Sequence, residues 1–131
     1  MKPELRNKDK GNFFIRYVKS FCHAINGIFY AIRYEHSMYI IILAIIVVTS
    51  AGFFFQISTI EWIFCILVMG LITAVELINS AIEAVCDLVT TEINPLVKIA
   101  KDTAAGASLV LSIAAACIGI MIFLPKILSL F

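Results

Sequence analysis

The sequence predicts an all-α membrane protein, with an amphipathic interfacial helix and three transmembrane helices in a single domain over residues 1–131. Its composition supports this fold class, since 62% of the residues are hydrophobic and only 15% are charged, with a mean hydropathy of +1.02. A soluble domain of this length cannot bury so much apolar surface, because small folds leave a large share of their surface in water. Three long apolar stretches are the second supporting observation.

The first expected element is a helix over residues 12–34, preceded by a flexible charged start at residues 1–11. Its apolar residues recur at intervals of three and four, whereas its polar residues lie towards the opposite side. This pattern is typical of a helix that lies in the membrane interface. The apolar side carries Phe14, Tyr17, Val18, Phe21, Ile25, Ile28 and Phe29, and the polar side carries Arg16, Lys19, His23 and Asn26.

Three apolar helices are expected over residues 39–55, 60–89 and 97–124. The first contains no charged residue and is close to the ~20 residues that a helix needs to cross ~30 Å of hydrocarbon. Residues 56–59 form a polar break, after which Glu61 and Trp62 open the second helix. Proline disfavours a helix across its position, so Pro95 is expected in a loop and Pro125 at the end of the third helix.

The basic residues predict the orientation, because cytoplasmic segments are enriched in Lys and Arg. The start of the chain is basic, residues 56–61 contain no Lys or Arg, and Lys98 and Lys101 form a second cluster. We therefore expect the amino terminus in the cytoplasm and the carboxyl terminus, near Lys126, on the far side. A net charge of +1 gives no indication of a nucleic-acid partner. The four cysteines have no zinc spacing and are expected to be packing residues.

A polar stripe interrupts the second apolar helix. Glu76, Asn79, Glu83 and Asp87 are spaced so that they share one helix face. Ionisable groups within a membrane helix cost free energy, so they are rarely present without a function. Carboxylates on one stripe also repel each other unless a cation lies among them, and oxygen ligands of this kind suit Mg²⁺. The alternative is that the stripe is only the solvated end of the helix, which applies most to Asp87 and least to Glu76.

Three further residues lie near the same side of the membrane. Lys101 and Asp102 open the third helix, where a lysine can neutralise phosphate charge or can simply extend to the interface. Glu35, before the first span, is either a ligand or a solvated carboxylate at a helix end. The chain contains neither GxxxxGK[ST] nor GxGxxG, so any ATP site uses another arrangement.

Two motifs carry a resemblance to a known family. The first is E-x-x-N-S-A-I-E-x-x-x-D over residues 76–87, and the second is A-K-D over residues 100–102. Together they resemble the signature of the bacterial diacylglycerol kinase / undecaprenol kinase family, over residues 12–125. Arg16, Lys19, Gly27 and Glu35 also match in order and spacing. The chain departs from the family pattern at His36-Ser37 and Ile93-Asn94.

The resemblance implies a homotrimer in the bacterial cytoplasmic membrane, with ATP and Mg²⁺ bound on the cytoplasmic side. It implies that Glu76 is the general base and that Glu35 and Glu83 are metal ligands. The candidate cofactor-binding residues are Arg16, His23, Glu35, Asn79, Glu83, Glu92, Lys101 and Asp102.

The predicted function is a lipid kinase that phosphorylates the hydroxyl of a membrane lipid alcohol. Undecaprenol is the preferred acceptor, because residues 94–107 resemble the undecaprenol kinase branch, and diacylglycerol is the alternative. Two remote alternatives are a proton-coupled transporter that uses Glu76 or Glu83 as a relay and an inactive protein that keeps the fold.

Overall fold

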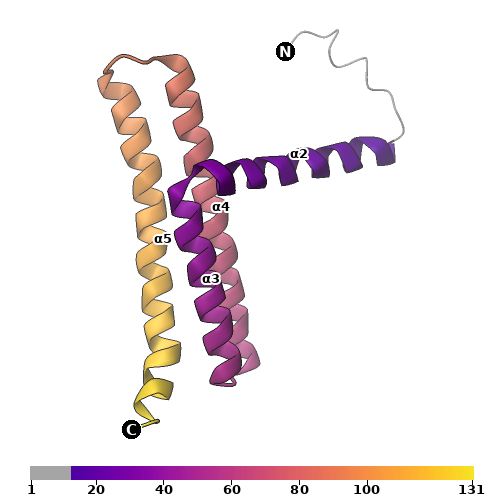
Figure 1. Cartoon of the computed structure of the whole chain (residues 1–131). Coiled ribbons are helices and arrows are strands. Elements are labelled where there is room, and N and C mark those ends of the chain that lie inside the picture. Colours follow the sequence, from indigo (N-terminus) through magenta and orange to yellow (C-terminus); the bar gives the residue numbers. More distant parts are fainter. Residues whose placement is uncertain (1–12) are drawn as a thin grey trace. The chain divides into compact units, whose positions relative to one another are not determined.

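A computed structural model of the chain describes residues 13–131, and this part of the chain contains four α-helices and no β-strand (Figure 1). The predicted flexible start lies outside these residues. Three of the helices, α3, α4 and α5, are long and apolar enough to cross a membrane. This confirms the predicted fold class of an all-α membrane protein.

Helix α2 covers Phe13–Tyr34 and belongs to a different structural unit from residues 35–131, so it is described by itself. Its aromatic rings pair one turn apart, Phe13 with Tyr17 and Tyr30 with Tyr34, at centroid distances of 4.7 Å and 4.6 Å. These rings are exposed. An exposed row of aromatic side chains suits the predicted position of α2 in the membrane interface, where such rings are favoured.

Helix α3 covers His36–Phe54 and starts three residues before the predicted boundary. Glu35 has an extended backbone and its carbonyl accepts the first bond, from the Met38 N–H at 3.2 Å. The predicted start was placed at the first residue of the apolar run, Tyr39, whereas the helix begins directly after the extended residue Glu35. After Phe54, Gln56 adopts a φ of 49° in the tight turn to the next helix.

Helix α4 covers Thr59–Val89 and begins with a capping box. The Ser58 N–H donates to the Glu61 carboxylate at 2.7 Å, and the Ser58 hydroxyl accepts from the Glu61 N–H at 3.3 Å. Two of the N–H groups that every helix start leaves unpaired are satisfied in this way. The helix therefore has a fixed first turn, which sets the positions of all the polar residues further along it.

Helix α5 covers Pro95–Leu128, with Asn94 as its N-cap. The prediction that Pro125 ends this helix is wrong. Proline removes only its own N–H, and the Pro125 carbonyl still accepts from the Ser129 N–H at 3.1 Å. Lys126, in the same last turn, pairs with Glu61 at 3.1 Å, which attaches this end of α5 to the start of α4.

Helix α4 packs along both α3 and α5 (Figure 1). At one end, Ile57, Cys65 and Ile122 form a buried apolar cluster that the rings of Phe55, Trp62 and Phe123 cover. Two ion pairs fix the antiparallel register of α4 and α5. Glu61 pairs with Lys126, and near the other end of α4 the Asp87 carboxylate pairs with the Lys101 ammonium at 2.6 Å.

Gly52 is a point of close approach between α3 and α4. A Cβ atom at this position would lie 2.7 Å from the Trp62 ring. We expect Gly52→Ala to lower the free energy of unfolding by about 1–3 kcal/mol, because a ring in a packed cluster cannot move aside without strain. Thermal unfolding in detergent measures the loss.

Gly70 is the matched control, since it also lies within a membrane helix and a Cβ there meets nothing within 4 Å. Gly70→Ala is expected to change stability by no more than about 1 kcal/mol. Equal effects of the two substitutions would show that the contact with Trp62 is not what requires glycine at position 52.

Candidate functional site

The face of α4 that packs in the bundle changes from apolar to polar halfway along the helix. Cys65, Met69 and Ile72 are followed on the same face by Glu76 and Asn79, since all are three or four residues apart. The apolar part of this face packs inside the bundle, on a helix long and apolar enough to cross a membrane. The polar part continues towards the loop that connects α4 to α5, so one continuous face joins a lipid-like environment to a charged one.

Glu76 and Asn79 are buried, at 7% and 8% relative exposure, whereas Ile78 between them is 58% exposed. In a water-soluble protein the apolar side chain would be buried and the polar side chains would be exposed. In a membrane helix the observed pattern means that the apolar side chain faces lipid and the polar side chains face the protein, which is usual for functional polar residues. The burial of Glu76 argues against the alternative that the stripe is only a solvated helix end.

Hydrogen bonds order the polar face. The Asn79 amide nitrogen donates to the Glu83 carboxylate at 3.3 Å, and the Ser80 hydroxyl donates to the Glu76 carbonyl at 3.0 Å. The first bond holds Asn79 so that its carbonyl oxygen points away from Glu83, and this oxygen is buried with no hydrogen-bond partner. Asn79 is thus positioned between two acidic residues of the predicted site.

Lys101 is brought to the same end of α4 through its ion pair with Asp87. The Asp87 side chain is 69% exposed and that of Lys101 is 36% exposed, so water screens the pair. Asp87, which the sequence left open between a functional and a solvated role, is therefore a direct partner of the predicted nucleotide-binding lysine. The sequence alone could not show this contact, because it joins two helices.

A cavity of about 470 Å³ lies at the connection between α4 and α5. Three of the predicted cofactor-binding residues, Glu92, Lys101 and Asp102, line it together. Lys98 also lines it, although the sequence pattern indicates only a role of this lysine in the orientation of the chain. Its position one helical turn before Lys101 was the signal that could have added it to the site.

Glu35 and Glu83, the two predicted metal ligands, lie on different elements. Glu35 is the N-cap residue of α3 and its side chain makes no capping bond, while the Glu83 carboxylate accepts from Asn79. Among residues 13–131 of one chain, no three His, Cys, Asp or Glu side chains converge in a way that could hold a metal ion. Shared metal binding by these two carboxylates therefore stays a prediction.

Arg16 and His23 lie on α2, two turns apart, and line one open cavity of about 630 Å³ together with Lys19. The Phe13 and Tyr17 rings line it as well, so basic and aromatic side chains share this cavity, and its basic groups suit contact with phosphate. Since α2 forms its own structural unit, the predicted roles of Arg16 and His23 towards the nucleotide stay predictions.

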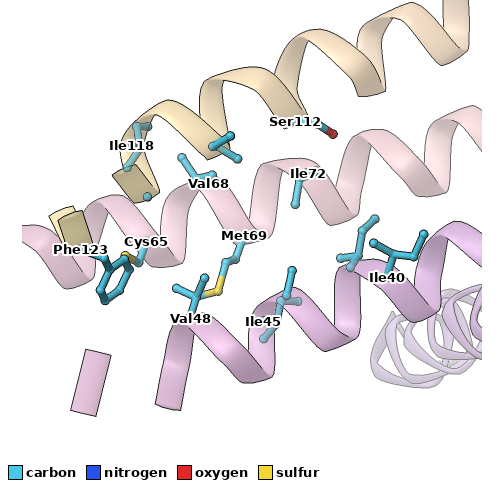
Figure 2. Close-up of a pocket in the computed structure, with 15 residues that line it drawn as sticks. Ile40, Ile45, Val48, Cys65, Val68, Met69, Ile72, Ser112, Ile118 and Phe123 are labelled. Carbon is cyan, nitrogen blue, oxygen red and sulfur yellow. The ribbon is translucent and has the colours of Figure 1, made fainter. Parts of the chain in front are cut away.

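An apolar groove of about 390 Å³ runs between α3, α4 and α5 (Figure 2). Ile40 and Ile45 line it from α3, Met69 and Ile72 from α4, and Ser112 from α5. Its volume and apolar lining are typical of sites that bind small apolar molecules. The groove begins one turn from Glu76, since Ile72 precedes Glu76 by four residues.

Comparison with known proteins decides the family. A family model described as prokaryotic diacylglycerol kinase matches residues 22–123. The chain belongs to this family. This confirms the resemblance that the two sequence motifs carry.

The curated proteins that are similar to this chain include an undecaprenol kinase and several diacylglycerol kinases. The chain is 41% identical to the undecaprenol kinase of Bacillus subtilis (strain 168) over 121 residues, which are 92% of this chain and 98% of that relative. It is 37% identical to a diacylglycerol kinase of Synechocystis over 112 residues, covering 85% and 64% of the two chains. A diacylglycerol kinase of Helicobacter pylori (strain ATCC 700392 / 26695) is 42% identical over 71 residues, covering 54% and 55%.

Membership in the prokaryotic diacylglycerol kinase family confirms the prediction of a lipid kinase. A kinase of this family uses a nucleotide and a lipid within the membrane, and the three apolar helices fit a membrane location. The transporter alternative loses its support, because the matching family model and the similar curated proteins are kinases.

Proposed function

We propose that this chain is an ATP- and Mg²⁺-dependent kinase that phosphorylates the hydroxyl of undecaprenol. The observation that carries the kinase chemistry is the burial of Glu76 and Asn79 on a membrane helix, between an apolar groove that ends one turn before Glu76 and, further along the same helix, a cavity lined by Lys101. This arrangement supports the proposal, because Glu76 lies where the packed face of α4 changes from apolar to polar residues. A water-insoluble alcohol and a water-soluble nucleotide meet at such a boundary.

Phosphoryl transfer needs alignment and charge neutralisation more than covalent help. Glu76 accepts the proton of the lipid hydroxyl as its oxygen attacks the terminal phosphate, which is the role of a general base. The nucleotide binds in the cavity at the connection between α4 and α5, which is lined by Glu92, Lys98, Lys101 and Asp102. Arg16 and His23 on α2 are proposed as further contacts to phosphate.

Mg²⁺ would be held by Glu83 and Glu35, whose carboxylate oxygens are the ligands that this ion prefers. When bound, the ion neutralises the negative charge of the phosphates. Glu83 fits this role because Asn79 donates to one of its oxygens and so fixes the carboxylate in one orientation. The proposed orientation places this end of the bundle and the amino terminus in the cytoplasm, where ATP is present.

The choice of undecaprenol over diacylglycerol rests on the relatives. The undecaprenol kinase of Bacillus subtilis aligns with nearly the whole chain and nearly its own whole length, whereas the diacylglycerol kinases align over 64% or less of theirs. The test is transfer of labelled phosphate from ATP to each lipid, side by side in detergent micelles. Undecaprenol is expected to be the better acceptor, and transfer to neither lipid would refute the proposal.

The homotrimer is also part of the proposal. Within the small-residue stretch 104–108 of α5, Ala105 and Ala107 are exposed in the single chain and allow a helix of a neighbouring subunit to approach closely. Chemical crosslinking in detergent tests the oligomeric state. Mixing two variants, each inactive through a different site residue, tests whether active sites form between subunits, because partial recovery of activity requires residues from two chains.

Glu83→Gln is expected to raise the Mg²⁺ concentration needed for half-maximal rate by roughly tenfold or more, because a neutral amide binds the cation more weakly than a carboxylate. The amide oxygen still accepts from Asn79, so the variant removes the charge and keeps the hydrogen bond. A Mg²⁺ titration of the initial rate measures the effect. An unchanged titration curve would show that Glu83 is not a metal ligand.

A further inference from the structure

Two side-chain atoms in the described part of the chain are buried without a hydrogen-bond partner, and both belong to the α4–α5 pair. They are the carbonyl oxygen Oδ1 of Asn79 and the hydroxyl oxygen Oγ of Ser108. A buried polar atom that lacks a partner costs free energy, so native proteins supply one from a side chain, water or a ligand. The two atoms therefore indicate that a polar group binds here.

Ser108 is unlike the other hydroxyl residues near it. The hydroxyls of Thr73, Ser80, Thr103 and Ser112 each donate to the carbonyl four residues earlier. This back-bonding is the usual way in which a helix satisfies a serine or threonine. The Ser108 hydroxyl does not use it and is buried, so its hydrogen remains available for a partner outside its own helix.

The register of the two helices places Ser108 level with Asn79. Asn79 lies eight residues before Asp87 on α4, and Ser108 lies seven residues after Lys101 on α5, while Asp87 and Lys101 are in contact. With a rise of 1.5 Å per residue in both helices, the two positions differ in height by about one residue. Ser108 and Lys101 are also two turns apart, so Ser108 lies on the face of α5 that carries the contact with α4.

The apolar groove between α3, α4 and α5 ends close to Asn79 and Ser108, on the side away from the loop that connects α4 to α5. Ile72 from α4 and Ser112 from α5 both line the groove (Figure 2). One turn further along α4 is Glu76, and one turn back along α5 is Ser108. A molecule that fills the groove therefore has its end close to Glu76, Asn79 and Ser108, and the group that meets them must be polar.

We propose that Ser108 and Asn79 together bind the hydroxyl of the lipid alcohol, with its hydrocarbon chain in the groove between α3, α4 and α5. A hydroxyl group has one hydrogen to donate and also accepts, so on binding it can donate to Asn79 Oδ1 and accept from the Ser108 hydroxyl. Its hydrogen turns to the Glu76 carboxylate, three residues from Asn79 on the same helix face, as the oxygen attacks the phosphate. No purely apolar molecule can satisfy these two atoms. The assignment rests on the proposed function and adds Ser108 as an acceptor-binding residue.

Ser108→Ala tests the assignment, because it is expected to change the binding of the lipid acceptor and not the binding of the nucleotide. We expect the KM for undecaprenol to rise roughly tenfold, the cost of one buried hydrogen bond, with the KM for ATP unchanged. Ser108→Thr retains the hydroxyl and is expected to restore the acceptor KM to within about threefold of the wild type. Ser129→Ala is the control, because Ser129 is the C-cap at the opposite end of α5 and its hydroxyl donates to the Lys126 carbonyl at 2.7 Å.

A second measurement separates this inference from the proposed function. Equilibrium binding of a tritiated short-chain prenol, without nucleotide, reports occupancy of the site whether or not phosphate is transferred. Weaker binding to Ser108→Ala than to the wild type and to Ser129→Ala supports the inference even if no lipid is phosphorylated. Active enzyme whose prenol affinity and acceptor KM do not depend on Ser108 overturns the inference and leaves the proposed function intact.

A bound water is the other source of a hydroxyl at this position. In that case Ser108→Ala lowers the thermal unfolding temperature and leaves prenol affinity unchanged, which overturns the assignment. If Ser108→Ala abolishes activity while prenol affinity is unchanged, the assignment is overturned as well, because the residue then acts after acceptor binding. Raised acceptor KM with an unchanged unfolding temperature is the pattern that supports it.

Discussion

Glu76→Gln is expected to lower kcat by about 10²- to 10⁴-fold, the usual contribution of a general base. The substitution replaces a carboxylate by an amide of the same shape, so it removes the proton acceptor without opening a cavity. Glu76 is buried on α4, and a neutral side chain is at least as well tolerated there. The fold is therefore expected to be retained, and equilibrium binding of Mg·ATP is expected to stay within about twofold of the wild type.

Glu61→Gln is the control for this experiment. Glu61 lies on the same helix, fifteen residues earlier, and pairs with Lys126 away from the proposed site. Its loss is expected to change kcat by less than about twofold, since the pair lies at the opposite end of α4 from the polar face and glutamine can still accept from the Lys126 ammonium group. If Glu76→Gln retained a near-normal rate, or if both variants lost activity equally, Glu76 would not be the base.

The polar face of α4 could be predicted from the sequence because it depends only on helix geometry. Residues three and four positions apart share a face, so Glu76, Asn79 and Glu83 had to lie together once the segment was helical. The bond from Asn79 to Glu83 joins residues four apart on this helix. Local spacing thus determines both which residues meet and how they are oriented.

Contacts between helices could not be predicted in the same way. The pair of Asp87 and Lys101 depends on the length of the loop after Val89 and on how α5 rotates about its axis. Ser108 gave no signal for a similar reason, because most helical serines are satisfied by their own backbone. Only the register of α4 against α5 shows that Ser108 lies opposite Asn79.

Helix ends were predicted least well. Pro125 was expected to end α5, but the cost of a proline is smaller near a terminus, where a single N–H is lost and the chain beyond is short. The contact of Lys126 with Glu61 holds the last turn in place. This contact connects residues 65 positions apart in the sequence, so no local pattern could reveal it.

Lys101→Met is expected to raise the KM for ATP roughly 10- to 100-fold, the cost of losing a charge-assisted contact to phosphate. Lys101 lines the cavity at the connection between α4 and α5 and is held there by Asp87. Methionine keeps the length of the side chain and removes its charge. Initial rates over a range of ATP concentrations at saturating lipid measure the effect, and the acceptor KM is expected to be unchanged.

Asp87→Asn separates a role in nucleotide binding from a role in the ion pair. Both variants break the pair between Asp87 and Lys101, but only Lys101→Met removes the positive charge that faces the cavity. If Lys101 binds phosphate, Asp87→Asn changes the KM for ATP by no more than a few fold, because the released ammonium group can still reach the nucleotide. If the pair itself is what matters, the two variants and the double variant all show the same loss. That result would assign Lys101 to the packing of α4 against α5 and would leave Lys98 as the cavity-lining lysine available for the phosphates.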